Sequence, residues 1–295
     1  MRIIKTSICF FDDREVRAVW DEQGSKWWFS ALDVVGAING ESDYNKNRNY
    51  WKYLKAKIKK SGNELGSATT QLKLTALDGK QYRSDALCSE DVISLAKFIP
   101  NNKATKFLDW FLYSDNTIDG QSKKKAYTFW ESNLIGDTEV GSVKALQKIH
   151  AYIFAGLCDF AGQIRTVNIA KGGFLFALVR YLSDTLKTIE AMPDTSFDEI
   201  VDKYVEMNVA HPFMDGNGRS TRLWLDLIFK RSLKKCVDWS KVGKKEYLDA
   251  MQRSVTDSTA IKALLHEALT DKINDREIFM KGVDYSYYYE QEDDK

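Results

Sequence analysis

The second half of the chain is dominated by apolar positions that recur with the 3.6-residue period of an amphipathic helix. The segments with this pattern are 140–160, 174–192, 196–210, 217–232, 244–254 and 257–270. One of them opens with Ser196 followed three residues later by Glu199, the spacing of a capping box. We therefore expect a domain built almost entirely from helices.

The first half has a different pattern, with short alternating stretches that indicate strands. The expected strands are Ile3–Phe11, Val16–Trp20 and Lys26–Phe29, with a turn at Asp21–Gly24, and a hairpin formed by Gln71–Ala76 and Gln81–Ser84 around Asp78-Gly79. Helices are expected to begin near Ser30, Asn45 and Ser89. The periodicity is interrupted around 115–128. The pattern thus predicts a mainly α protein: a small α+β domain over 1–115, a linker and lead-in helix over 116–137, and a helical domain over 138–295.

The composition is that of an ordinary globular protein, with 44% apolar and 29% charged residues among 295. The net charge of +1 conceals two halves of opposite sign. Up to Lys125 there are 21 Lys and Arg against 16 Asp and Glu, and after it 22 against 26. The four cysteines lie far apart, which argues against a zinc site and a secreted disulfide framework. No apolar run approaches the length of a membrane span, and the N-terminal stretch is too short for a signal peptide, so we expect a cytoplasmic protein.

The most informative segment is His211–Arg222, which reads HPFMDGNGRSTR. Glycines before a helix let backbone N–H groups point at an anion, which the helix dipole also favours. Arg219 and Arg222 are three residues apart and lie on one face, where their guanidinium groups could donate paired hydrogen bonds to phosphate oxygens. Asp215 is a hard oxygen ligand suited to Mg²⁺, and His211 is a candidate general base.

This segment resembles the signature of Fic proteins, His-x-Phe-x-Asp/Glu-Gly-Asn-Gly-Arg-x-x-Arg, at every fixed position. The resemblance extends from about 138 to 290 and implies an all-helical Fic domain with a β-hairpin flap, acting as an adenylyltransferase with ATP as co-substrate. It implies that His211 takes a proton from a Tyr, Ser or Thr hydroxyl of a target protein. Asp215 would hold Mg²⁺, and Gly216, Asn217 and Gly218 would line the hole for the α-phosphate. Arg219 and Arg222 would clamp the β- and γ-phosphates.

The resemblance also covers the run from Cys158 to Phe174, which is similar to the second helix and flap of the family. The flap would dock the target as an added strand. Its docking residues would be Thr166, Val167, Asn168, Ile169 and Gly172. Lys171 either reaches the nucleotide or target, or is a solvated flap lysine. Tyr247 and Met251 either wall the adenine or belong to the core.

Two further details refine the family assignment. In the related death-on-curing toxins a lysine replaces the glycine at 218, so Gly218 favours AMP transfer over phosphate transfer. Near the C-terminus, Ser286 and Glu290 resemble the inhibitory motif Ser/Thr-x-x-x-Glu, which implies an inhibitory helix near 284–291 in which Glu290 pairs bidentately with Arg222. Gln291 departs from the family's Gly or Asn, and a frayed tail is the alternative. Three neighbouring tyrosines are candidates for self-modification: Tyr287, Tyr288 and Tyr289.

The region before 115 lies outside this likeness and weakly resembles the N-terminal module of Bro-type antirepressor proteins, which is often taken to bind DNA. The resemblance rests on Trp27–Val35 and Val92–Phe98. A basic helix carries cations beside aromatic residues, namely Arg48, Lys52, Lys55, Lys57, Lys59 and Lys60 with Tyr50, Trp51 and Tyr53. It is either a DNA-binding surface or a solvated face. His150 and His266 are expected to be structural.

Three functions of different classes therefore remain open. The favoured one is a protein adenylyltransferase inhibited by Glu290. The others are a Fic-type enzyme of another activity, such as phosphate transfer or removal of AMP, and a DNA-binding regulator with an accessory Fic domain. Type II topoisomerase subunits are first candidates for the target, because some bacterial relatives act on them. Apolar helical faces could serve the core or a homo-oligomer interface.

Overall fold

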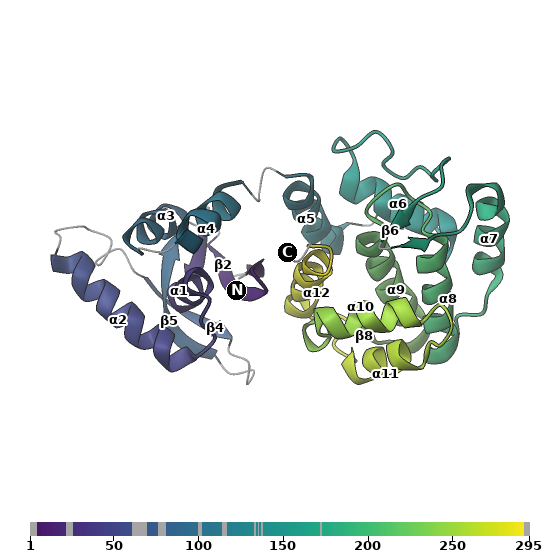
Figure 1. Ribbon diagram of the computed structural model, residues 1–295. Helices are drawn as coiled ribbons and strands as arrows, with labels where there is room; N and C mark the ends of the chain where they lie inside the picture. Colours follow the sequence, from purple (N-terminus) through teal and green to yellow (C-terminus); the bar gives the residue numbers. More distant parts are fainter. Residues whose placement is uncertain are drawn as a thin grey trace. The chain divides into compact units, whose positions relative to one another are not determined.

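The fold is described from a computed structural model in which the well-placed residues are 5–21, 26–60, 70–75, 81–99, 102–113, 117–132, 134, 136, 138–171 and 173–291. The chain divides into two compact units, one up to Thr117 and the other from Ile118 to Gln291. The prediction of a mainly helical protein with a small α+β region at its N-terminus is confirmed (Figure 1).

The first unit contains a five-stranded antiparallel sheet with the order β1-β2-β3-β5-β4. Its strands are β1 (Lys5–Phe11), β2 (Arg14–Asp21), β3 (Lys26–Ser30), β4 (Thr70–Thr75) and β5 (Gln81–Cys88). The expected pairing of the second hairpin is confirmed, since Thr75 lies opposite Gln81. Its turn dipeptide Asp78-Gly79, and the turn residues 22–24, lie outside the described residues.

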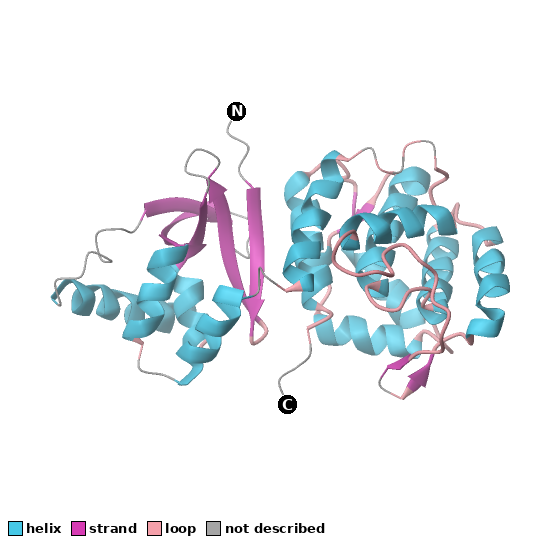
Figure 2. Cartoon of the chain, turned by 90° about the horizontal axis from the view of Figure 1, so that it is seen from above, coloured by secondary structure: helices cyan, strands magenta, loops and turns pink. Residues whose placement is uncertain are grey.

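The helices among the described residues of this unit are α1 (Ala31–Asn39), α2 (Tyr44–Lys60), α3 (Ser89–Phe98) and α4 (Asn102–Tyr113). The strands lie on one side of the unit and the helices on the other (Figure 2). Ser30 caps α1 by accepting a hydrogen bond from the Asp33 N–H at 3.3 Å. The core between the two layers includes Phe29, Ile38 and Phe107. Burial of this apolar surface stabilises the unit.

The second unit is built from helices, with two short two-stranded sheets. Its helices are α5 (Ile118–Thr128), η3 (Phe129–Glu131), α6 (Val143–Phe154), α7 (Val179–Ala191), α8 (Phe197–Ala210), α9 (Asn217–Leu233), η4 (Trp239–Lys241), α10 (Lys244–Arg253), α11 (Thr259–Ala268) and α12 (Arg276–Tyr288). The capping box of α8 is present, with Ser196 and Glu199 in both reciprocal bonds. Helix α5, from the segment expected as linker and lead-in helix, packs on α6 and α12.

Three predicted helices are too long. The helix expected over 140–160 is α6, which spans only Val143–Phe154. Phe174–Leu175 is strand β7, which pairs with β6 (Ala170–Lys171), so the helix expected over 174–192 begins only at Val179. Leu269–Thr270 is strand β9, which pairs with β8 (Cys236–Val237). In both places the apolar residues satisfied a helical period, but tertiary pairing of the backbone determined the local structure.

Helix α9 lies at the centre of the unit and packs against α6, α8 and α12 (Figure 1). Its apolar residues Trp224, Ile228 and Phe229 are fully buried. The polar residues of its first two turns are buried as well, including Arg219 and Arg222. Buried guanidinium groups require charged or hydrogen-bonding partners, and these two arginines have both. None of the helices in the described part of the chain combines the length and the hydropathy needed to cross a bilayer.

Candidate functional site

The loop between α8 and α9 is closed by the side chain of Asn217. Its amide nitrogen donates to the Phe213 carbonyl and its oxygen accepts from the Phe213 N–H, both at 2.8 Å. Gly216, the residue before Asn217, has a φ of 74°, and a Cβ there would lie 2.2 Å from the Phe154 ring. Only glycine fits this position without strain. The side chain of Asn217 thus holds the loop, and α9 begins at its backbone, so the expected part of Asn217 in an anion hole stays a prediction that concerns its backbone N–H.

His150 of α6 also holds this loop in place. Its Nδ1 accepts the Gly162 N–H at 2.8 Å, so its Nε2 carries the hydrogen and donates to the Asp215 carbonyl at 2.9 Å. The ring stacks on Phe213 with centroids 3.9 Å apart. Burial lowers the pKa of His150 to about 4, which keeps it neutral. This histidine is a satisfied structural residue, as expected. The other, His266, contacts Phe197 edge-on.

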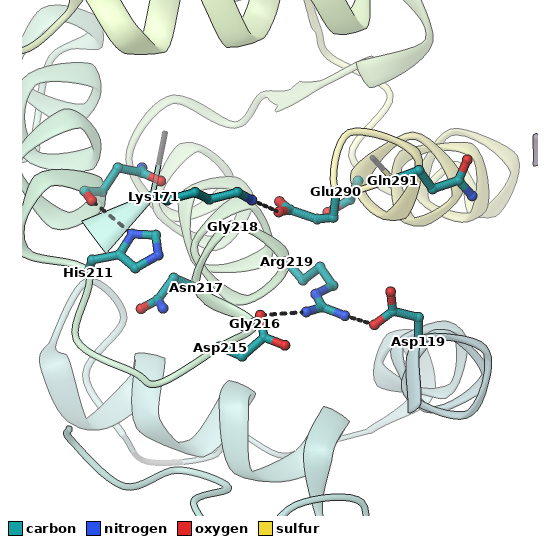
Figure 3. A network of polar contacts seen from close by, with 12 residues as sticks. Asp119, Lys171, His211, Asp215, Gly216, Asn217, Gly218, Arg219, Glu290 and Gln291 are labelled. Atoms are coloured by element: carbon teal, nitrogen blue, oxygen red, sulfur yellow. Dashed lines mark hydrogen bonds and ion pairs between the residues drawn. The ribbon is translucent and has the colours of Figure 1, made fainter. Parts of the chain in front are cut away.

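His211 stands at the end of α8 with a φ of 49°, where its N–H still bonds to the Met207 carbonyl at 3.1 Å. Its Nδ1 lies 3.2 Å from the Asn208 carbonyl, and its ring stacks on Phe176 with the centroids 3.7 Å apart. Figure 3 shows the imidazole beside the loop that carries Asp215 to Asn217. A carbonyl only accepts, so Nδ1 carries the hydrogen and Nε2 keeps a lone pair. Burial lowers the pKa of His211 to about 4. The imidazole is therefore neutral and can accept a proton.

Arg165 orders the backbone around His211, a role that sequence reasoning missed. Its Nε donates to the His211 carbonyl at 2.8 Å, and its Nη2 donates to the Ala210 carbonyl at 3.1 Å. Other bonds reach Val167 at 2.7 Å and Ala177, on the two sides of the β6–β7 hairpin. This one buried side chain ties the hairpin to the histidine loop. A sequence offers no signal for it, because its partners are backbone carbonyls.

The β6–β7 hairpin is the predicted flap, and it lies beside His211. Its paired residues include Lys171 and Phe174, and the Phe176 N–H bonds to the Ile169 carbonyl at 3.3 Å. Asn168 accepts the Val179 N–H at 2.8 Å, whereas Thr166 and Val167 are exposed. Gly172 lies outside the described residues. Lys171 Nζ lies 3.7 Å from Glu290 Oε2, so the lysine faces the site from the flap (Figure 3).

Arg222 is almost completely buried and donates hydrogen bonds to three residues of the site. Its Nη2 donates to Glu290 Oε1 at 2.6 Å and to the Ser286 carbonyl at 2.7 Å. Its Nε donates to the Ser286 hydroxyl at 2.7 Å, and its Nη1 to the Tyr247 hydroxyl at 3.1 Å. The expected pairing with Glu290 is present, but the expectation that it is bidentate is wrong. Ser286 and Tyr247 occupy the other donors of the guanidinium.

Glu290 lies just beyond the end of α12 and against the first turn of α9. A Cβ on Gly218 would lie 2.2 Å from Glu290 Oε1, so only a glycine leaves room for the carboxylate. Burial raises the pKa of Glu290, but the charge and hydrogen bond of Arg222, together with Lys171, outweigh it and hold the pKa below its ordinary value. The carboxylate is therefore ionised and lies at the N-terminal end of α9, where the helix dipole favours a negative charge.

Arg219, the second motif arginine, is held by two other carboxylates. One is Asp215 of the loop, 3.0 Å from Nη2, and the other is Asp119 of α5, which contacts Nη1 (Figure 3). The guanidinium also lies over the rings of Phe154 and Tyr287, at 5.0 and 5.6 Å. Asp119 was missed because it is 100 residues away in a segment expected to be a linker.

Four tyrosines near the arginines differ in accessibility. Tyr247 is a core residue: its hydroxyl lies 2.5 Å from that of Tyr204, and its ring stacks on Tyr289 at 4.7 Å. Met251, on the same helix, is half-buried. The Tyr289 hydroxyl donates to the Val242 carbonyl at 2.7 Å, and Tyr287 is also buried. Self-modification of Tyr287 or Tyr289 would therefore require α12 to move, whereas Tyr288 is half-buried.

Asp215 is the expected metal ligand and extends from the loop with 70% of its side chain exposed. Its Oδ1 accepts from the Gly216 N–H at 2.6 Å and from Arg219. Within the described ranges, no group of three or more His, Cys, Asp and Glu residues is arranged to hold a metal. One exposed carboxylate still fits Mg²⁺, which is commonly bound by one or two carboxylates together with substrate phosphates and water.

Comparison with known proteins gives a consistent result. Residues 141–229 match the model of the Fic/DOC family. The chain is 28% identical over 137 residues to the probable protein adenylyltransferase y4lH of Sinorhizobium fredii, covering 42% of this chain and 69% of that protein. It is 25% identical over 176 residues to the protein adenylyltransferase VbhT of Bartonella schoenbuchensis, covering 54% of this chain and 37% of VbhT. The crystal structure of Bartonella tribocorum BepC with bound AMPPNP superposes with a TM-score of 0.46 at 19% identity, covering 52% of this chain and 84% of that one.

Proposed function

We propose that this chain, which carries a Fic/DOC domain over residues 141–229, is a protein adenylyltransferase that moves AMP from ATP to a hydroxyl side chain of a target protein. The observation that carries the proposal is a neutral histidine beside an anion-binding helix start and two buried arginines. The relatives named protein adenylyltransferases support the same activity.

The start of α9 is the proposed binding site for the phosphates of ATP. The first N–H groups of a helix have no partners within it and point outward, where the helix dipole attracts anions. Gly218 leaves this end open, and Arg219 and Arg222 supply two positive charges on the same face. Asp215 would hold Mg²⁺, which would neutralise phosphate charge when bound.

His211 is the proposed general base. Its Nε2 accepts the proton of the target hydroxyl as the hydroxyl oxygen forms a bond to the α-phosphorus. The bond from the α-phosphorus to the bridging oxygen breaks, and pyrophosphate leaves with the electron pair. The backbone N–H groups at the start of α9 stabilise the charge that develops on the α-phosphate. The Asn208 carbonyl keeps the imidazole in its orientation, and Arg165 holds the backbone carbonyl of His211.

Glu290 is proposed to inhibit this reaction. Its carboxylate contacts Arg222 and covers Gly218, so it competes with the phosphates of ATP for the same donors. Ser286 strengthens the arrangement by binding Arg222 through both its hydroxyl and its carbonyl. Displacing the carboxylate from Arg222 would allow the triphosphate to bind in a productive orientation.

The target protein is proposed to dock along the flap, because the Phe176 ring that follows β7 stacks on His211. Val167 and Leu175 are half exposed, and apolar side chains at such positions suit a strand of another chain. A type II topoisomerase subunit is the first candidate to test as this target.

A labelling experiment tests the proposed activity. Glu290→Gly is incubated in a lysate and with purified topoisomerase subunits, in parallel with α-³²P-ATP and γ-³²P-ATP. Label from the α-phosphate alone, abolished by His211→Ala, is the expected result. Label from the γ-phosphate would show phosphate transfer instead. Release of AMP from a modified target without incorporation would indicate the reverse reaction.

A second proposal concerns DNA binding by the first unit. The side chains of α2 that face solvent include Arg48, Lys52, Lys57, Lys59 and Lys60. On the sheet, the exposed residues Lys73 and Arg83 lie directly opposite each other, a like-charge pair that a polyanion would relieve. Fluorescence anisotropy with duplex DNA should show binding that weakens steeply with salt. Unchanged anisotropy at low salt would exclude this proposal.

A further inference from the structure

Helix α5 carries three polar side chains at four-residue intervals, which places them on one face. Asp119, at its start, contacts Arg219 of α9. Lys123 and Tyr127, further along, both contact Asp284 of α12, with Lys123 Nζ 2.6 Å from the carboxylate. One face of α5 thus contacts both the motif helix and the helix that leads to Glu290.

The surroundings of Arg219 show what Asp119 contributes. The arginine side chain is only 4% exposed, and its Nε has no hydrogen-bond partner among the residues described. Its charge is balanced by Asp215, from its own motif, and by Asp119, from outside it. A buried guanidinium left without carboxylates would be costly, so the free protein needs this pairing.

Asp119 differs from Asp215 in how it is placed. It belongs to a separate helix, and its side chain is 57% exposed, so the carboxylate can turn into water at little cost. The relation of Asp119 to Arg219 therefore parallels that of Glu290 to Arg222. In each pair a carboxylate from outside α9 neutralises an arginine near the start of that helix.

We propose that Asp119 is a second carboxylate that competes with the nucleotide, holding Arg219 in the free protein while Glu290 holds Arg222. This rests on the proposed function, because it requires both arginines to bind the outer phosphates of ATP. The phosphates must displace two carboxylates, one from α5 and one from the end of α12. Removing Glu290 alone relieves only one of them.

The contacts with Asp284 connect the two carboxylates. Asp284 is fully buried, and its bonds with Lys123 and Tyr127 fix α12 against α5. Breaking a buried charged pair of this kind costs free energy, so α5 and α12 move together. A partner that pulled α5 away would separate Asp119 from Arg219. At the same time it would displace α12 and so weaken the contact of Glu290 with Arg222.

Calorimetric titration with Mg-ATP and with AMP tests this proposal. The variants are Glu290→Gly and the double variant that adds Asp119→Ala, with Asp184→Asn added to Glu290→Gly as control. Asp184 is an exposed aspartate whose carboxylate pairs with Lys187 of its own helix. The double variant should bind ATP about three- to tenfold more tightly than Glu290→Gly, as expected for loss of one partly exposed charge pair.

AMP distinguishes competition from a general change of structure, because it lacks the β- and γ-phosphates. Its affinity should be the same in both variants, and melting temperatures check that each is folded. Equal ATP affinity, weaker ATP binding in the double variant, or an equal gain for AMP would overturn the role of Asp119. Asp119→Asn, which keeps the size of the side chain, provides a second test with the same expectations. Tighter ATP binding without AMP transfer would leave the competition intact and refute the proposed activity.

Discussion

Replacing Glu290 by glycine is the most informative perturbation of this site. The variant removes the carboxylate that lies 2.6 Å from Arg222 Nη2 and 3.7 Å from Lys171 Nζ. The contact with Lys171 contributes little, because that lysine is 71% exposed. The contact with Arg222 is a short hydrogen bond between charged groups, with the arginine buried, and such bonds contribute about 1.5–3 kcal/mol.

This magnitude converts directly to an affinity. If ATP must first displace the carboxylate, the loss of about 2 kcal/mol of competing interaction strengthens ATP binding about thirtyfold. Calorimetric titration with Mg-ATP measures this change. Because the bound triphosphate is also oriented better, incorporation of label into the target should rise at least as much.

The control variant is Gln291→Gly, which introduces the same flexible residue one position later at an exposed side chain. It should bind ATP as the unaltered protein does. If Glu290→Gly and Gln291→Gly have the same affinity for ATP, competition between Glu290 and the phosphates is refuted. Glu290→Gln, which keeps the shape and removes the charge, should give an intermediate affinity.

Three further predictions concern the residues that support the site. NMR titration should give His211 an apparent pKa near 4, because burial disfavours the imidazolium; the resonance is assigned by its loss in His211→Ala, and a value near 6.5 would contradict its burial. Asp284→Asn should lower the free energy of unfolding by about 3 kcal/mol, since it removes the buried charge that Lys123 contacts, and an unchanged midpoint in urea would refute the estimate. Gly216→Ala should destabilise the protein by about 2 kcal/mol or more, because its φ is 74° and its Cβ would overlap the Phe154 ring; full stability would mean that the loop relaxes easily.

The parts of the molecule that could be predicted are those whose signals are local in sequence. A few neighbouring residues are enough to predict the backbone conformation or the chemistry in these parts. Examples are the capping box at Ser196, the glycines at 216 and 218, and the paired arginines. Glu290 was predictable because its spacing from Ser286 matches a known motif, and the contact with Arg222 follows from it.

The parts that could not be predicted depend on partners distant in the chain. Asp119 looks like any acidic residue at a helix start, and only the packing of α5 shows that it contacts Arg219. Arg165 binds backbone carbonyls, which every residue has. The sequence allowed Tyr247 either to contact the adenine of the nucleotide or to belong to the core. The fold distinguishes these two roles, since the Tyr247 hydroxyl is held by Tyr204 and Arg222.

The central claim is that the start of α9 holds a triphosphate with its innermost phosphorus facing His211. The most direct measurement is a crystal structure of Glu290→Gly grown with Mg²⁺ and a non-hydrolysable ATP analogue. We expect phosphates on the first turn of α9, with the outer two on Arg219 and Arg222 and the α-phosphate on the side of His211 Nε2. A nucleotide bound in the reverse direction, or bound away from the start of α9, would contradict this placement.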